Sequence, residues 1–100
     1  MNIRIRDEAE AELEDAFDYY QRKRDGLGHK FLDDYLHGVQ QIAGAPHRWP
    51  YDRASKVARR YRLDHFPYNL IYRVLPDHCM IIAVAHQRRR PGYWRDRLRE

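Results

Sequence analysis

The side chains best suited to binding or catalysis are concentrated near the C-terminus, in residues 86–97. This segment combines a histidine, five arginines and two large aromatic residues: His86, Arg88, Arg89, Arg90, Tyr93, Trp94, Arg95 and Arg97. A guanidinium group binds phosphate or carboxylate through two parallel hydrogen bonds and also stacks on flat rings. A hydrophobic core has no use for so many charges. The segment therefore indicates a surface that binds a negatively charged partner.

Charge is divided unevenly along the chain, whose net charge is +4. Residues 1–50 carry 7 Lys and Arg against 10 Asp and Glu, and residues 51–100 carry 12 against 5. The two halves therefore differ in sign, at −3 and +7. A strongly positive half favours an acidic protein or a nucleic acid as partner. The sign of the charge alone does not distinguish between these two kinds of partner.

Length and composition restrict the class of protein. A chain of 100 residues predicts one domain, residues 1–100, with a single core. The only cysteine, Cys79, lies in an apolar run without a disulfide partner, which fits the reducing cytoplasm. The sequence shows neither a membrane-spanning stretch nor an apolar signal segment, so we expect a cytoplasmic protein that stays out of membranes. Metal-ligand spacings are also missing from the sequence, so we expect neither a metal nor a cofactor.

A short strand followed by a helix is predicted at the N-terminus. Two isoleucines alternate with polar residues in residues 2–6, which is typical of a half-buried strand. Apolar side chains in residues 9–20 then recur at helical spacing and form one stripe. Asp7 has the position of an N-cap, and Glu10 three residues later completes the pattern of a capping box. We therefore expect the helix to begin at this cap.

A second helix is predicted over residues 28–43, where apolar side chains form one broad face before Pro46. Only residues 26–28 separate the two helical patterns, so we expect an antiparallel hairpin of helices. Acidic side chains on such a hairpin usually face water. We expect this for Asp15, Asp18, Asp33 and Asp34.

The second half of the chain changes to the two-residue period of strands. Residues 57–63, 68–75 and 79–85 are joined by short turns, which predicts an antiparallel meander. Because residues 79–85 are all apolar, we expect them in the centre of the sheet. Residues 91–98 have room for one or two helical turns. The expected fold is α+β: an antiparallel sheet of the N-terminal strand and the meander, with the helical hairpin on one face and the tail on the other.

Three segments of the second half resemble the RelE/ParE superfamily of bacterial toxins. They are FPYNLIYRV at 66–74, IIAVAHQRR at 81–89 and PGYW at 91–94. The resemblance implies a small basic toxin that an acidic antitoxin, encoded beside it, holds inactive in a hetero-oligomer. It leaves two activities open. ParE-like members poison DNA gyrase by binding, whereas RelE-like members cut messenger RNA in the ribosome.

The RelE-like alternative requires a set of catalytic residues. Cleavage of RNA by its own 2′-hydroxyl needs a base, an acid and cations that stabilise the phosphorane. The resemblance implies that these tasks would fall to Arg60, Arg62, His86 and Arg88, with Tyr93 or Trp94 in the place of a C-terminal tyrosine. Asn69 occupies the position at which RelE-like nucleases carry a strand arginine, and an amide has no positive charge.

Binding to gyrase needs no catalytic set, so we interpret the chain as ParE-like, with the ribosome-dependent nuclease as the alternative. The predicted surface for gyrase or antitoxin consists of Arg60, Arg62, Arg73, His86, Arg88, Arg89, Arg90, Tyr93 and Trp94. Structural roles are the competing interpretation for several of them. His86 is then a hydrogen-bonded strand end, Arg60 and Arg62 keep a sheet face soluble, and Tyr93 and Trp94 cap the sheet.

Overall fold

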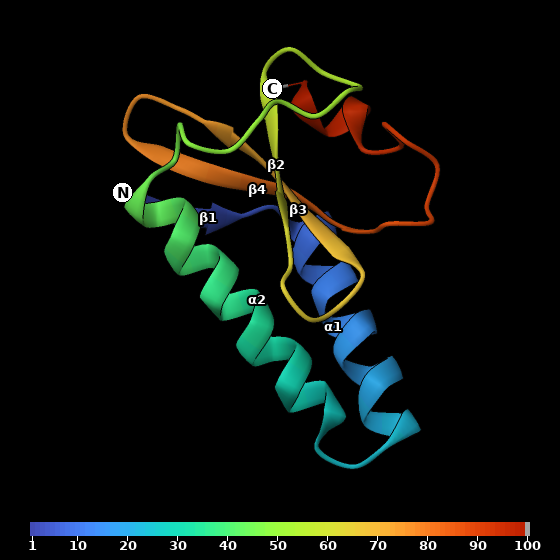
Figure 1. The fold of residues 1–100 in the computed structure, drawn as a ribbon. Helices are drawn as coiled ribbons and strands as arrows, with labels where there is room; N and C mark the ends of the chain where they lie inside the picture. The colour runs from blue at the N-terminus through green and yellow to red at the C-terminus, as the bar shows by residue number, and fades with distance from the viewer. Residues whose placement is uncertain (100) are drawn as a thin grey trace.

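The computed structural model describes residues 1–99 and has the α+β architecture predicted from the sequence (Figure 1). Its elements follow in the order β1 (Asn2–Ile5), α1 (Asp7–Lys23), α2 (Leu27–Gly44), β2 (Ala58–Arg62), β3 (Tyr68–Val74), β4 (His78–His86) and the 3-10 helix η1 (Arg95–Leu98). Both helices and the three strands of the meander lie where the periodicity of the sequence predicted them.

The four strands form one sheet in the order β1-β4-β3-β2. Strands β2, β3 and β4 are antiparallel, which confirms the predicted meander. Strand β1 pairs with β4 in parallel, from Asn2 opposite His78 to Ile5 opposite Ile81, so the expectation of an antiparallel β1 was wrong. Alternating burial is the same for a strand read in either direction, and the sequence pattern therefore carried no information about the direction of β1.

The start of α1 also differs from the prediction. The helix begins at Asp7, Arg6 is the N-cap residue, and no side chain caps the helix. Arg6 is extended because its N–H continues the parallel ladder and donates to the Ile81 carbonyl at 3.0 Å. The capping box of Asp7 and Glu10 was therefore wrong, since the strand ladder fixes the chain one residue before the expected cap. The acidic first turn still complements the positive end of the helix dipole.

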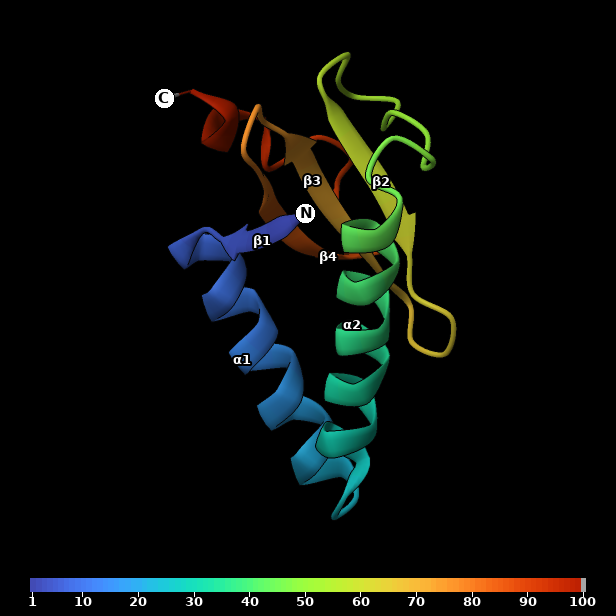
Figure 2. The ribbon, with the colours of Figure 1, turned by 90° about the vertical axis from the view of Figure 1, so that its left-hand side faces the viewer.

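Two hydrophobic clusters cover opposite faces of the sheet, and β4 contributes to both. Figure 2 shows both helices on one face, where Phe31 and Ile42 of α2 pack against the sheet. On the other face Trp94 covers a patch of β-strand side chains that includes Ile71 and Ile82. Strand β4 is therefore central and buried on both faces, as its unbroken apolar run predicted.

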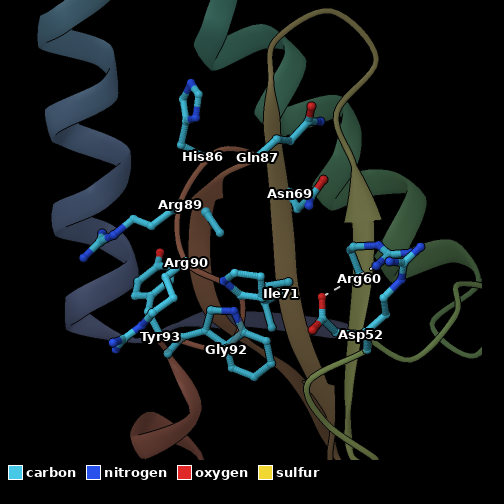
Figure 3. Close-up of a pocket in the computed structure, with 14 residues that line it drawn as sticks. Asp52, Arg60, Asn69, Ile71, His86, Gln87, Arg89, Arg90, Gly92 and Tyr93 are labelled. Carbon is cyan, nitrogen blue, oxygen red and sulfur yellow. Dashed lines mark ion pairs between the residues drawn. The ribbon is translucent and has the colours of Figure 1, made fainter.

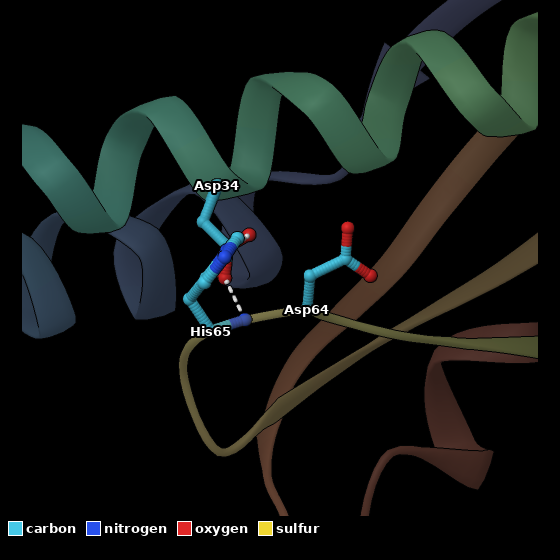
Figure 4. A group of neighbouring side chains, drawn as sticks. All are labelled: Asp34, Asp64 and His65. Atoms are coloured by element: carbon cyan, nitrogen blue, oxygen red, sulfur yellow. Dashed lines mark hydrogen bonds and ion pairs between the residues drawn. The ribbon is translucent and has the colours of Figure 1, made fainter.

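Asp34 corrects the expectation that the acids of the helical hairpin are solvated. Asp15, Asp18 and Asp33 are exposed, but Asp34 is only 6% exposed. Its Oδ2 accepts the N–H groups of His65 and Phe66 at 2.9 and 3.1 Å, so it anchors the β2–β3 turn to α2 (Figure 4). A buried carboxylate in this place is satisfied by two backbone donors of the turn.

Asp64 and His65 lie beside this carboxylate at the same turn (Figure 4). The ligand atoms of Asp34, Asp64 and His65 are within 4.8 Å of one another. The backbone donors already engage Asp34, and His65 Nδ1 lies 3.1 Å from its Oδ1. These hydrogen bonds explain why Asp34 and His65 converge, and Asp64 lies 3.4 Å from His37 Nε2 of α2.

None of the helices within residues 1–99 combines the length and the apolar character that crossing a lipid bilayer requires.

Candidate binding site

A pocket of about 250 Å³ opens on the face of the sheet opposite the helices, between the meander and the C-terminal tail (Figure 3). It is lined by residues of the loop before β2, of the meander and of the tail: Asp52, Arg53, Arg60, Asn69, Ile71, Ala85, His86, Gln87, Arg89, Arg90, Pro91, Gly92, Tyr93 and Trp94. Four of these are arginines and one is a carboxylate, so the pocket has an excess of positive charge.

The register of the meander brings the floor of the pocket together. Arg62 of β2 lies opposite Asn69 of β3, which in turn lies opposite Ala85 of β4. Arg60 and Ile71 form the next cross-strand pair on the same face. Directly paired residues point to the same side of a pleated sheet. The small side chain of Ala85 leaves room above the sheet, and Asn69 therefore faces an open space.

Arg60 and Arg62 lie on the same face of β2 but in different surroundings. Arg60 lines the pocket, where its Nη1 is 3.8 Å from Asp52 Oδ1. The other oxygen of Asp52 accepts the N–H of Ala54 at 2.9 Å, so the carboxylate is held by its own loop. Arg62 is exposed and lines an adjoining depression instead. The two arginines thus place two positive charges side by side on the face of β2 that is opposite the helices.

A glycine turn and a buried tryptophan hold the tail over the sheet. Gly92 has a φ of 74°, and a Cβ at this position would lie 2.9 Å from the Cβ of Ala54. Only glycine adopts this conformation without strain and leaves that space free. Trp94, two residues further on, is 2% exposed and packs in the cluster on this face of the sheet. The buried Trp94 ring therefore holds this wall of the pocket in place.

Glu12 of α1 is the main link between the helices and the tail. Its Oε2 accepts a hydrogen bond from the Tyr93 hydroxyl at 2.6 Å. Its Oε1 and Oε2 also accept hydrogen bonds from the two terminal nitrogens of Arg97, at 2.9 and 3.0 Å respectively. Arg89 Nη1 lies 3.4 Å from Oε2. The Glu12 side chain is 15% exposed, so this largely buried charge is neutralised by cations and hydrogen bonds together.

The same ion pair completes the outer edge of β4 beyond the end of β1. The N–H of Val84 donates to Glu12 Oε1 at 3.0 Å, and the Ile82 carbonyl accepts from Arg97 Nη1 at 3.1 Å. Glu12 is absent from the predicted site, although a signal for it exists. It lies three residues after Ala9 and four before Ala16, on the stripe that α1 buries, where a carboxylate needs a partner.

The hydroxyl of Tyr93 points away from the pocket, and the ring of Trp94 is buried below it. The Tyr93 hydroxyl points to Glu12, and the guanidinium of Arg89 lies over its ring at 3.8 Å from the centroid. Burial raises the pKa of Tyr93 far above its usual range, and the hydrogen bond to Glu12 adds to the effect. Both residues therefore line the pocket as structural side chains.

The remaining predicted residues are spread around the pocket. His86 Nδ1 accepts the N–H of Arg88 at 3.1 Å, and its ring, packed edge-on against Tyr68, points away from Arg60 (Figure 3). Arg90 is exposed on the rim. Arg88 is also exposed but does not line the pocket, and Arg73 Nη1 lies 3.4 Å from the Leu98 carbonyl. The pocket brings together six of the predicted residues, Arg60, His86, Arg89, Arg90, Tyr93 and Trp94, and leaves Arg62, Arg73 and Arg88 outside.

Comparison with known proteins identifies the family. The sequence model of the ParE toxin of type II toxin–antitoxin systems, parDE, matches residues 3–91. The chain belongs to the ParE toxin family. Among solved structures, this ParE-family chain is similar to one from a chromosomal ParDE toxin–antitoxin system of P. aeruginosa, with a TM-score of 0.73 and 20% identity over 86% of this chain and 95% of that one. The likeness supports the shared fold. No curated protein matched the sequence.

Alkaline pH is expected to destabilise this ParE-family toxin through its buried tyrosines. Burial raises the pKa of Tyr68 to about 12 and raises the pKa of Tyr72 and Tyr93 further. An unfolded tyrosine titrates near pH 10, so the contribution of Tyr68 is complete below about pH 10 and is lost as the pH rises towards 12. Urea unfolding at pH 8, 10 and 11 measures the loss.

Two further measurements complete this test. Absorbance of tyrosinate should show these three rings titrating late, and Tyr68→Phe should make the stability less dependent on pH above 10. Titration of all eight tyrosines near pH 10 without loss of stability would contradict the assignment.

Proposed function

We propose that this ParE-family chain acts in the cytoplasm as the toxin of a toxin–antitoxin pair, that it poisons DNA gyrase by binding, and that a cognate acidic antitoxin neutralises it. The family match supports the class of toxin. The charge of +7 on the second half of the chain supports an acidic antitoxin, because opposite charges speed and orient the association.

The condition of the acid–base groups in the pocket supports binding over cleavage of RNA. Within residues 1–99 the pocket-lining groups that could transfer a proton are Asp52, His86 and Tyr93. Asp52 is engaged by Ala54 and Arg60, His86 by the backbone of Arg88, and Tyr93 by Glu12. General acid–base catalysis needs groups within hydrogen-bond reach of the substrate. In this pocket the hydroxyl of Tyr93, the Asp52 carboxylate and one ring nitrogen of His86 already have protein partners, which supports binding over acid–base catalysis.

The neutral side chain of Asn69 supports the same conclusion. It lines the centre of the pocket, with the strands that carry Arg60 and Ala85 on either side. Stabilising a phosphorane at this point requires a cation, and loss of one such group typically costs orders of magnitude in rate. An amide at the centre still donates and accepts hydrogen bonds, which is enough for recognition.

Two assays on the purified protein test this function against the nuclease alternative. We expect the protein to block supercoiling by gyrase or to accumulate cleavage complexes, while toeprinting in a cell-free translation extract shows an intact message. Addition of the antitoxin encoded beside the toxin should restore supercoiling. Normal supercoiling at excess toxin, together with cuts at codon positions, would reject the proposal and support the RelE-like nuclease.

A further inference from the structure

We propose that the pocket and its adjoining depression bind consecutive backbone phosphates of DNA, without regard to base sequence. The inference rests on the proposed function, because gyrase is an enzyme that holds DNA. It adds that the toxin contacts the nucleic acid in that complex as well as the protein.

Three of the four arginines that line the pocket are accessible to a ligand. Arg60 has Asp52 as its ion-pair partner at 3.8 Å, and no nearer acceptor is present within residues 1–99. Arg53 and Arg90 are exposed and line the pocket, and in the same residues neither side chain has a carboxylate within salt-bridge distance. An anion that enters here meets the guanidinium groups of Arg53 and Arg90, which no carboxylate within residues 1–99 neutralises, and that of Arg60, whose carboxylate partner lies at 3.8 Å.

The depression next to the pocket continues the same chemistry. It is lined by Arg53, Arg60, Arg62, Asn69 and Gln87 together with Trp49 and Pro50, and four of these residues also line the pocket. The two hollows therefore share a border made of two arginines and two amides. A single carboxylate would occupy one hollow. A polymer with an anion at every repeat can occupy both, and a nucleic-acid strand is such a polymer.

The aromatic rings near the two hollows are unsuited to stacking on bases. Trp94 is 2% exposed, and the face of the Tyr93 ring is covered by Arg89. Trp49 packs edge-on against Tyr61, with the guanidinium of Arg48 over its ring at 4.9 Å. Binding of bases by stacking needs free ring faces. Recognition is therefore confined to the phosphate backbone, which predicts sequence independence and a strong dependence on salt.

Fluorescence anisotropy with labelled DNA tests the inference directly. Two duplexes of unrelated sequence should bind the toxin with equal affinity, and the affinity should fall steeply as salt is raised. Arg60→Gln should weaken binding about tenfold to both duplexes and lower the salt slope by about one. Arg53→Gln should act in the same direction. Arg22→Gln is the matched control, because Arg22 is exposed in the last turn of α1 and lines neither the pocket nor the depression.

The outcomes separate this inference from the proposed function. A melting curve first establishes that each variant is folded. Absence of DNA binding at low salt, or equal affinity of Arg60→Gln and Arg22→Gln, would overturn the inference. If the toxin still inhibits gyrase in that case, the proposed function stands without it. If a glutamate-rich peptide binds through Arg60 and DNA does not, the pocket is a site for protein carboxylates and the inference is likewise overturned.

Discussion

Glu12→Ala is expected to lower the free energy of unfolding by about 3 kcal/mol and to free the C-terminal tail. The substitution removes the acceptor for Tyr93, Arg97 and Val84 at once. Arg97 would keep its positive charge in a largely buried place without the carboxylate that neutralises it, and this residual charge accounts for most of the loss. Urea unfolding measures the change in stability.

Two other substitutions of α1 show whether the loss comes from this network. Glu12→Gln retains an acceptor for the N–H of Val84 but loses the charge, so its stability should lie between those of the wild type and Glu12→Ala. Glu14→Ala removes an exposed glutamate two residues away and should change stability by less than about 0.5 kcal/mol. Equal stability of Glu12→Ala and Glu14→Ala would show that the network contributes nothing. Tryptophan emission should shift to the red only where the tail is released, because Trp94 then meets water.

Trp94→Ala is expected to cost about 3–5 kcal/mol, the usual range for removing a buried aromatic ring from a core. Trp94 fills the space between the tail and Ile71, Ile82 and Ala83, so its loss leaves a cavity under the pocket. The variant should lose stability and, with it, the proposed inhibition of gyrase. Urea unfolding and a supercoiling assay at a temperature where the variant is still folded measure the two effects.

Trp94→Phe keeps a ring in this space and should recover most of the stability. The pair of variants distinguishes packing from contact with the target. If Trp94→Ala is as stable as the wild type but fails to inhibit gyrase, Trp94 is a contact residue and its burial in the free toxin is not what matters for function.

The parts of the fold that the sequence predicted are those that local patterns encode. The stripe of α1 and the broad face of α2 depend on spacings of three and four residues, and the apolar run of β4 needs only to be read as buried on both faces. The direction of β1 and the burial of Asp34 depend on partners far along the chain, at residues 78–81 and 65–66. A periodic pattern reports that a face is buried but not what covers it.

The same limit applies to the candidate site. Residues 86–97 were recognisable as a cluster of cations and rings, but composition could not sort those that face the pocket from those that hold the tail. That division is made by Glu12, which lies 81 residues before Tyr93 and 85 before Arg97. Arg60 lies in the site because of the register between β2 and β3, and the predicted meander made this placement predictable.

The parallel pairing of β1 with β4 affects how the toxin is made. Strand β1 precedes the rest of the sheet in the chain, but its partner β4 begins only at His78, and β4 is also the strand with which β3 pairs. At about 5–20 residues per second, the ribosome needs on the order of 4–15 s to pass from the end of β1 to the start of β4. The helices have local contacts and can form during this time, whereas the complete sheet can form only after β4 has been synthesised. The face of the sheet that carries the pocket is therefore absent from the nascent chain until β4 has been synthesised.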